Sequence, residues 1–392
     1  MKVAQVSTRF PPGPGGVERH VDEVARRLAA RGRSVEVFTS DLRREYPMER
    51  LPPTVPREES RDGVTVHRLR VWSMPGELHY PFFRGLGPAL ARSRPDVVHV
   101  HTFGTNQVAV ARRHRARTRT PFVLTAHFHP IWSIEGGWLR HRIRGFYDRR
   151  LAGPVLGAAS RVIVQSKEEE RLLRALGLRL PPLDIVPPGY TPLPDPPAGP
   201  VFRDRFRIPG PYVLFVGRLA SNKGLVDLVT AFASLAREDP QAHLVLVGGD
   251  GGQRATVEAR VHGFGLDGRV HLLGHVADES LLAAAYREAT VTVLPSEYEA
   301  FGLVLLESLA QATPVIATRV GGIPEFIEDE RSGLLVPPKD ATALAAALRR
   351  LWTDPALARR LGHHGRVETV PRFTWERLVD RLDAIYEEVL RA

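Results

Sequence analysis

The stretch Val213–Leu225, VLFVGRLASNKGL, decides the fold class of this chain. Its apolar beginning predicts a buried strand that ends at Gly217, and a second apolar segment starts at Leu225 after a short polar loop. A strand that leads through a glycine loop into a helix is the repeating unit of a parallel α/β sheet. The stretch therefore predicts an α/β fold.

The same alternation continues in both directions from this stretch. Apolar residues within Val17–Leu28 recur at helical spacing, and Gly32 follows as a stop signal. Both halves of the chain are thus expected to be doubly wound, with helices covering a parallel sheet. The predicted strands are Val3–Ser7, Val35–Thr39, Val97–Val100, Phe122–Thr125 and Val162–Val164 in the first half, and Tyr212–Val216, Leu244–Val247, Val270–Leu273, Val291–Leu294 and Val315–Ala317 in the second.

A proline-rich segment separates the two halves. Nine of the twenty residues 181–200 are proline, which excludes a helix or a central strand there. The length of 392 residues suits two domains. We predict one domain over residues 1–187, a second over 188–373, and a final helix within 374–392 that crosses back to the first domain or stays with the second. Two such domains would face each other across a cleft at the carboxyl ends of their strands, where ligands bind.

The composition excludes several classes of protein. There are no cysteines, so disulfides, thiolate zinc sites and cysteine nucleophiles are ruled out. No apolar run approaches the ~18 residues of a membrane span, and residues 1–10 lack the apolar core of a secretory signal. We therefore expect a cytoplasmic protein.

The net charge of +10 is unevenly distributed. Residues 1–187 hold 32 basic and 18 acidic side chains, whereas residues 188–392 hold 22 and 26. The excess in the first half suits an anionic partner: a membrane surface, a phosphorylated substrate or nucleic acid. Its densest basic segment, Arg112–Arg150, mixes arginines with apolar side chains, a mixture that suits anionic lipid; the alternative is an ordinary solvated surface. The apolar members in and beside this segment include Ile131, Trp132, Trp138, Leu139, Ile143, Phe146 and Leu151.

Two cations lie in the loop of the opening stretch. Arg218 follows Gly217, and Lys223 comes five residues later. A guanidinium fork and an ammonium point charge together suit a diphosphate, and the glycine lets a ligand approach the backbone. Lys223 is informative because the chain has only four lysines among 54 basic residues. The alternative is that both cations are exposed loop charges.

Two carboxylates follow in the segment Pro295–Pro314. Glu299 precedes a predicted helix whose opening loop, Ala300–Gly302, offers free N–H groups to an anion. Glu307 lies inside an apolar run, so its carboxylate needs a partner. A ribose diol is one candidate, and an arginine that serves only the fold is the alternative.

The first predicted strand leads into a glycine-rich loop that contains Gly15 and Gly16. The spacing matches neither the dinucleotide fingerprint nor a P-loop, so these glycines suit a rim where a ligand touches the backbone, or a simple strand–helix turn. His127 and His129 follow one predicted strand, and His99 and His101 close another. Metal binding is not expected, because no carboxylate lies at ligand spacing near either pair and the chain contains no Asp-x-Asp.

Together these segments resemble the retaining glycosyltransferases of family 4, which have the GT-B fold of two Rossmann-like domains. The resemblance covers nearly the whole chain, and the segments occur in the family's order. They are Gly15–Arg19, Phe122–His127, Val216–Gly224, Leu244–Gly251, Glu299–Glu307, Gly321–Glu325 and Gly333–Val336. Departures are small: Ala312 stands where the family often has glycine, and Arg33-Ser34 replaces a frequent Gly-His.

The resemblance implies transfer of a hexose, of the mannose or glucose type, from a UDP- or GDP-linked sugar to a lipid-linked or glycan acceptor, without a cofactor or metal. Arg218 and Lys223 would hold the diphosphate, Glu307 the ribose, and Glu299 would face the sugar. His127 would contact the transferred sugar, with His129 as the alternative. The implied catalytic residues are His127, Arg218, Lys223 and Glu299, and the implied donor-binding residues are Gly15, Gly16, Gly217, Gly274, His275, Val276, Phe301, Gly302, Leu303 and Glu307.

Two rival functions remain at this point. A sugar-nucleotide epimerase or hydrolase with the GT-B fold would use the same diphosphate residues without an acceptor. A basic nucleic-acid-binding protein would explain the charge of the first half but not Lys223, Glu299 and Glu307, so no nucleic-acid partner is expected. The basic segment predicts peripheral attachment to the inner face of a membrane.

Overall fold

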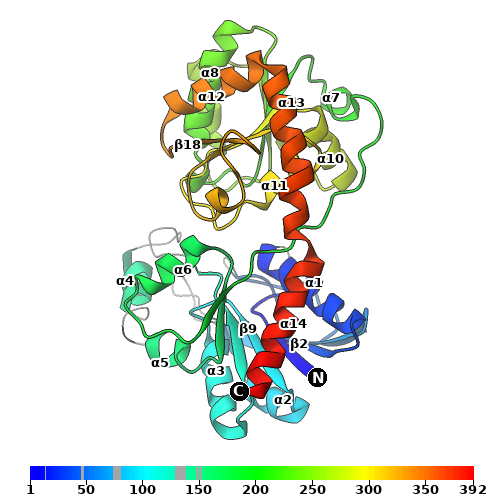
Figure 1. The fold of residues 1–392 in the computed structure, drawn as a ribbon, viewed down its shortest axis with the longest axis vertical. Coiled ribbons are helices and arrows are strands. Elements are labelled where there is room, and N and C mark those ends of the chain that lie inside the picture. The colour runs from blue at the N-terminus through cyan, green and yellow to red at the C-terminus, as the bar shows by residue number, and fades with distance from the viewer. Residues whose placement is uncertain (14, 46–47, 74–80, 129–137, 147–149, 151) are drawn as a thin grey trace. The chain divides into compact units, whose positions relative to one another are not determined.

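The computed structural model describes residues 1–392 except 14, 46–47, 74–80, 129–137, 147–149 and 151. The chain divides into two compact units: Met1–Gly189 with Trp375–Ala392, and Tyr190–Thr374. Each unit contains its own mainly parallel sheet with helices packed against it (Figure 1). The α/β class predicted from the sequence is confirmed.

The sheet of the first unit has the strand order β12-β11-β10-β9-β1-β2-β6-β5 and is parallel except at β5. The chain leaves β1 for β2 on one side and later returns to β9 on the other, so the order reverses at β1. Loops at the carboxyl ends of the strands meet at such a reversal, which is where α/β sheets bind ligands. The strands are β1 (Lys2–Val6), β2 (Ser34–Ser40), β5 (Glu58–Arg61), β6 (Val64–Leu69), β9 (Val97–His101), β10 (Phe122–Thr125), β11 (Arg161–Val164) and β12 (Leu183–Ile185).

Two short antiparallel ladders accompany this sheet: β3 (Leu42–Arg44) with β4 (Glu49–Arg50), and β7 (Val71–Ser73) with β8 (Pro81–Phe83). The helices of the unit are α1 (Gly16–Ala30), α2 (Leu86–Ser93), α3 (Asn106–Thr118), α4 (Trp138–Phe146), α5 (Ala152–Leu156), α6 (Lys167–Arg174) and α14 (Trp375–Arg391). Strand β12 lies at the edge of the sheet within the proline-rich segment, because an edge strand tolerates residues that cannot complete a ladder.

The last helix, α14, packs on the first unit. Its apolar side chains, among them Val379 and Ile385, share a buried cluster with Val21 of α1 and Val97 of β9. Arg33 strengthens this contact, since its guanidinium donates to both oxygens of Asp383 at 3.0 and 2.7 Å. The arginine that departs from the family pattern therefore serves to hold α14.

The sheet of the second unit has the order β15-β14-β13-β16-β17-β18 and reverses at β13. Its strands are β13 (Tyr212–Val216), β14 (His243–Val247), β15 (Val270–Gly274), β16 (Val291–Leu294), β17 (Val315–Thr318) and β18 (Leu334–Val336). Its helices are α7 (Val201–Phe206), α8 (Leu225–Glu238), α9 (Arg254–Gly263), α10 (Glu279–Glu288), α11 (Leu303–Ala310), α12 (Ala341–Thr353) and α13 (Pro355–His364). The loops after β13 and β16 flank the reversal, and they contain Arg218, Lys223 and Glu299.

Candidate functional site

In the first unit, Gly15 and Gly16 lie where the loop after β1 enters helix α1. Gly15 has φ of 151°, a conformation that residues with a Cβ rarely adopt, so this turn favours glycine; a Cβ here would also meet the Glu18 carboxylate at 1.9 Å. Glu18 is buried and pairs with Arg9 at 2.7 Å. Burial raises the pKa of Glu18, and the charge of Arg9 opposes that shift. A Cβ on Gly16 would meet nothing within 4 Å, so this glycine leaves room beside the backbone.

His127 follows strand β10 in a left-handed backbone conformation, with φ of 41°. Left-handed geometry is unfavourable for a residue with a Cβ, and strain of this kind is concentrated at functional sites. The next residue is held by Glu169, whose carboxylate accepts hydrogen bonds from the N–H groups of Phe128 and Gln165, both at 2.6 Å. Burial raises the pKa of Glu169 to about 7 against the effect of these two donors. His129, the alternative to His127, lies outside the described residues.

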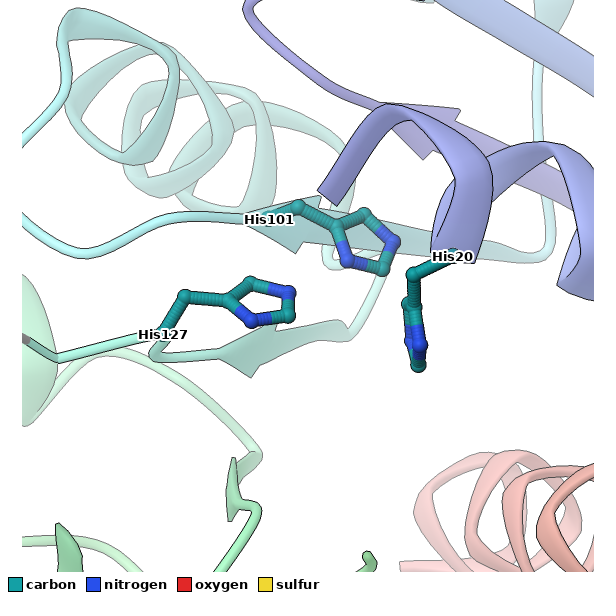
Figure 2. A group of neighbouring side chains, drawn as sticks. All are labelled: His20, His101 and His127. Atoms are coloured by element: carbon teal, nitrogen blue, oxygen red, sulfur yellow. The ribbon is translucent and has the colours of Figure 1, made fainter. Parts of the chain in front are cut away.

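The structure brings His20 of α1 and His101 of β9 to His127. Figure 2 shows the three imidazoles gathered close together from separate elements. The centroids of the rings are 5.5–5.8 Å apart. His99 belongs to the core instead, because its two ring nitrogens bond to Tyr386 at 2.6 Å and Thr125 at 2.7 Å.

In the second unit, Lys223 ends a short 3₁₀ turn, Ser221–Lys223, between β13 and α8. Its ammonium donates to Oε2 of Glu299 at 2.5 Å. The two side chains are 16% and 17% exposed, so the ion pair is largely removed from water. Removing one partner of such a pair leaves an uncompensated charge, which makes the pair sensitive to substitution.

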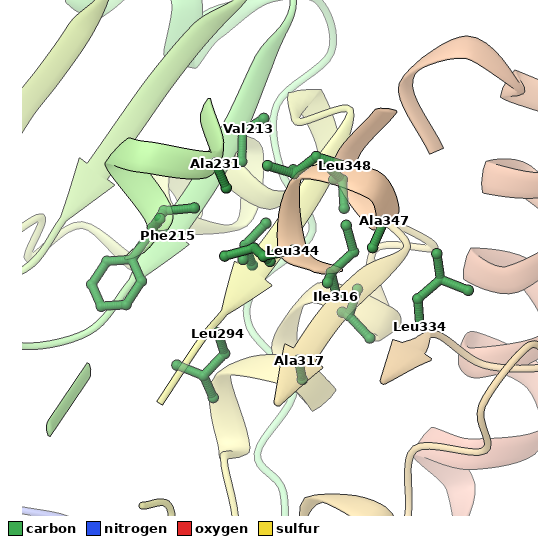
Figure 3. Packing of buried hydrophobic residues seen from close by; sticks show 14 of the residues in the cluster. Val213, Phe215, Ala231, Leu294, Ile316, Ala317, Leu334, Leu344, Ala347 and Leu348 are labelled. Atoms are coloured by element: carbon green, nitrogen blue, oxygen red, sulfur yellow. The ribbon is translucent and has the colours of Figure 1, made fainter. Parts of the chain in front are cut away.

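Close backbone contacts fix the loop that carries Glu299. A Cβ on Gly321 would lie 1.6 Å from the carbonyl oxygen of Glu299, and a Cβ on Gly224 would lie 2.0 Å from the carbonyl oxygen of Pro295. Ser296 also donates to the Glu299 carboxylate, at 3.4 Å. The loops rest on a close-packed core in which side chains of α8 and α12 meet the strands, as Figure 3 shows. The carboxylate and the ammonium are therefore presented by rigid backbone.

The ends of strands β13 and β14, beside this ion pair, also approach each other closely. A Cβ on Gly248 would lie 1.8 Å from the carbonyl oxygen of Gly217, so the ends of β13 and β14 approach as only glycine allows. Gly248 in turn donates its N–H to the carbonyl of Gly274 at 2.7 Å. Arg218 and His275 are exposed at these ends, whereas Val276 is buried. The two exposed side chains are thus accessible to a ligand.

The remaining predicted donor-binding residues lie at or on helix α11. Gly302 caps the helix with φ of 91°, and Leu303 begins it. The ring of Phe301 is buried and stacks on Phe326 at 4.7 Å, so only its backbone is left for a ligand. Glu307 accepts a hydrogen bond of 2.7 Å from the hydroxyl of Tyr286. Burial and the Glu307 charge raise the pKa of Tyr286, which keeps its hydroxyl protonated as the donor.

Helix α4 carries exposed aromatic and apolar side chains of the basic segment. Trp138, Ile143 and Phe146 are 72%, 48% and 56% exposed, and the guanidinium of Arg142 lies over the Trp138 ring at 5.9 Å. Ile131, Trp132 and Leu151, with the side chain of Leu139, lie outside the described residues. No helix in the described part of the chain is long and apolar enough to span a membrane.

The sequence missed three residues of these sites. His20 lies one helical turn after Gly16, a spacing that places both on one face of α1 and would have indicated it. Glu169 follows the capping residue Ser166 by three positions, a pattern that predicts a helix start but not the long-range bond to Phe128. Tyr286 carried no sequence signal, because only the packing of α10 on α11 brings it to Glu307.

Comparison with known proteins identifies the family. Residues 202–368 match the model of "Glycosyl transferases group 1", and residues 15–189 match that of the "Glycosyl transferase 4-like domain". The D-inositol 3-phosphate glycosyltransferase of Acidothermus cellulolyticus is 35% identical over 405 aligned positions, which cover 96% of this chain and 86% of that protein. The chain belongs to the group 1 glycosyltransferases.

Further relatives of this glycosyltransferase support the assignment. The glycogen synthase of Mycobacterium tuberculosis is 28% identical, covering 98% of this chain and 94% of that protein. The sucrose-phosphate synthase of Thermosynechococcus elongatus has a TM-score of 0.78 and 29% identity, covering 100% of this chain and 99% of that one. HepE of Anabaena, solved with UDP-glucose, has a TM-score of 0.74 at 20% identity, covering 99% and 100%. The expected GT-B fold is thereby confirmed.

Proposed function

We propose that this glycosyltransferase transfers a hexose from a nucleotide diphosphate sugar to a lipid-linked or glycan acceptor, with retention of the anomeric configuration. The observation that carries the proposal is the Lys223–Glu299 ion pair at the reversal of the second sheet. A largely desolvated cation on a rigid loop is suited to the negative charge that a departing diphosphate develops. Arg218, exposed in the same loop after β13, would add a forked donor to the same phosphates.

In the proposed reaction, an acceptor hydroxyl oxygen bonds to the anomeric carbon as the bond from that carbon to the diphosphate breaks. Attack occurs on the face from which the diphosphate leaves, and the hydroxyl proton passes to an oxygen of the leaving phosphate. Glu299 acts as a positioning and electrostatic group, because its carboxylate is already engaged by Lys223 and Ser296. Catalysis then rests on orientation and charge stabilisation rather than on a protein nucleophile.

Glu307 is proposed to accept hydrogen bonds from the ribose hydroxyls of the donor. Tyr286 bonds to one of its oxygens and so orients the carboxylate. Lys223 and Arg218 would neutralise the diphosphate in place of the divalent ion that other diphosphate-binding proteins use, so no metal is required at the donor. UDP-glucose, the ligand in the HepE complex, is the first donor to test.

Thermal stabilisation of the full chain by UDP, GDP and ADP, free and as sugar conjugates, tests the donor site. A ligand that binds only the folded state at a hundredfold excess over Kd adds about 2.7 kcal/mol to the free energy of unfolding. We expect one base to raise Tm, with or without EDTA, and Lys223→Ala to lose the shift. Absence of a shift with every nucleotide would refute the proposed donor.

Product analysis separates transfer from the rival activities. With donor alone, an epimerase or hydrolase would release a new sugar nucleotide or free sugar, whereas a transferase requires an acceptor. The acceptors to compare are a lipid-linked glycan, a glucan and, because relatives carry that name, D-inositol 3-phosphate. Turnover with inositol phosphate alone would replace the proposed acceptor class.

The exposed side chains of α4 support the lipid-linked acceptor. Tryptophan and phenylalanine beside arginine are typical of surfaces that enter the headgroup region of anionic bilayers. We expect the protein to float with vesicles that contain anionic lipid at low salt, and Trp138→Ser with Phe146→Ser to reduce the floated fraction. Equal flotation with neutral vesicles, or none with anionic ones, would remove membrane attachment from the proposal.

A further inference from the structure

The cluster of His20, His101 and His127 has the composition of a metal site rather than of a packed core. Nitrogen atoms of the three rings all lie within 4.8 Å of one another. Each ring comes from a different element, a helix, a strand and a strand-end loop (Figure 2). Convergence of three distant histidines on one space is not required by the fold of an α/β unit, whose layers pack apolar side chains.

A hydrogen-bond chain fixes which nitrogen of His101 faces the cluster. The Gln5 amide donates to the Tyr386 hydroxyl at 3.1 Å, which turns its carbonyl oxygen toward Nε2 of His101 at 2.8 Å. A carbonyl oxygen only accepts, so Nε2 of His101 carries the proton and Nδ1 keeps its lone pair. An outer partner that fixes the tautomer in this way is characteristic of metal-ligating histidines.

Two ring nitrogens of the cluster lack a protein partner. Nδ1 of His101 and Nδ1 of His20 are buried, and neither has a hydrogen-bond partner among the residues that the structure describes. Buried polar atoms are normally paired, so two unpaired nitrogens in one cluster point to a missing ligand. The ligand must accept electron pairs at least from Nδ1 of His101, because that atom carries no proton.

The charge state of the rings suits a cation. Burial lowers the pKa of His20 to about 4. Burial, together with the neighbouring histidines, lowers the pKa of His101 well below its ordinary value. His20 and His101 are therefore neutral at physiological pH, and neutral imidazole is the form that ligates metals.

We propose that His20, His101 and His127 bind one divalent transition-metal ion through three imidazole nitrogens, with a further coordination position left to water or a substrate oxygen. Imidazole ligands without a carboxylate select Zn²⁺, Cu²⁺ or Ni²⁺ over Mg²⁺ and Ca²⁺. Zn–N bonds of about 2.0–2.1 Å place tetrahedral ligands about 3.3 Å apart, so nitrogens that now lie up to 4.8 Å apart need to approach by at most about 1.5 Å to reach bonding geometry. All three histidines belong to the first unit, whereas Arg218 and Lys223 belong to the second.

Occupancy of this site would engage a side chain that the proposed transfer reaction also uses. His127 is the residue expected to contact the transferred sugar, so a bound metal and the sugar would compete for its imidazole. This consequence rests on the proposed function, whereas the binding of the metal does not. A binding measurement without donor or acceptor therefore tests the site independently of transfer.

The experiment titrates Co²⁺ into chelator-treated full-length protein and records the visible d–d bands, followed by displacement with Zn²⁺. We expect one equivalent to bind with the intense bands of a tetrahedral nitrogen site. His20→Phe, which keeps a ring of similar size without a nitrogen, is expected to weaken binding at least about 100-fold, and Gln5→Met, which removes the outer partner, about 10–100-fold. His127→Phe provides a second ligand variant should His20→Phe fail to fold.

His271→Phe is the matched control. His271 and His243 form a half-buried histidine pair in the second unit, with ring nitrogens 3.1 Å apart, and the same substitution there should leave Co²⁺ binding unchanged. The proposal is overturned if the wild-type protein shows no saturable binding, if folded His20→Phe and His127→Phe bind as the wild type does, or if His271→Phe alone abolishes the bands.

Discussion

In each unit, the charge of the side chains at the strand ends differs from the net charge of the unit. The first unit contains most of the excess positive charge, yet two buried, uncharged imidazoles, His20 and His101, lie beside His127 at its strand ends. The second unit is mildly acidic, yet its strand ends present Lys223 and Arg218. The comparison teaches that the net charge of a domain does not predict the chemistry of its site, because burial and local pairing set the charge of each group.

Among the substitutions that test this comparison, Lys223→Ala is expected to have the largest effect, which is on kcat/KM. Lys223→Ala leaves Glu299 without its cation and removes charge stabilisation of the diphosphate, so kcat/KM should fall by about 10²–10³-fold, as for loss of one transition-state donor. Steady-state transfer rates measure it. Lys339→Ala is the control, because Lys339 pairs with Glu297 at the surface with 69% of its side chain exposed, and should change the rate little.

Acidification should lower the free energy of unfolding of the first unit more than that of the second. The folded pKa values of His20 and His99, about 4 and about 3, lie below the unfolded value of 6.5, so their stabilisation is present above pH 6.5 and lost as pH falls toward the folded values. At pH 5 the loss is about 2 kcal/mol per histidine.

Urea unfolding at pH 7 and pH 5, followed by hydrogen exchange in each unit, checks this expectation. The first unit should open earlier at pH 5, and His20→Phe should recover about 2 kcal/mol of the loss. An equal loss in wild type and variant would show that His20 is not buried as a neutral ring.

A substitution at Glu307 sharpens the comparison within the second unit. Glu307→Gln keeps the partner of Tyr286 but removes the charge that would accept from the ribose, so KM for the donor should rise about tenfold, equivalent to about 1.4 kcal/mol, with little change in kcat. Initial rates over a range of donor concentrations measure the effect. An unchanged KM would return Glu307 to a purely structural role.

The smallest expected effect concerns the backbone at Ala312, where φ is 59°. Ala312→Gly should relieve left-handed strain and raise the free energy of unfolding by about 0.5–1 kcal/mol. Ala345→Gly, inside helix α12, should lower it by about 1 kcal/mol in the same denaturation assay. If Ala312→Gly did not raise the free energy of unfolding, the left-handed conformation of Ala312 would cost little.

The sequence by itself determined the α/β alternation and ten of the strands in the two main sheets, since short apolar runs bounded by glycine and proline specify buried parallel strands. It did not predict β5, β6, β12 and β18. It also indicated the candidates in the second unit, because Lys223 lies in the loop between one predicted strand and its helix, and Glu299 and Glu307 lie in the loop and helix after another. That Lys223 and Glu299 meet, 76 residues apart, follows only from the tertiary structure. Their roles toward a donor remain predictions.

Only the tertiary structure decided which side chains meet. His20, His101 and His127 are separated by tens of residues, and the order of strands in the sheet brings them together. The same holds for Tyr286 with Glu307 and for Glu169 with the backbone of Phe128. Local patterns report which face of an element is buried, whereas contacts between elements depend on how the layers pack, which no local spacing encodes.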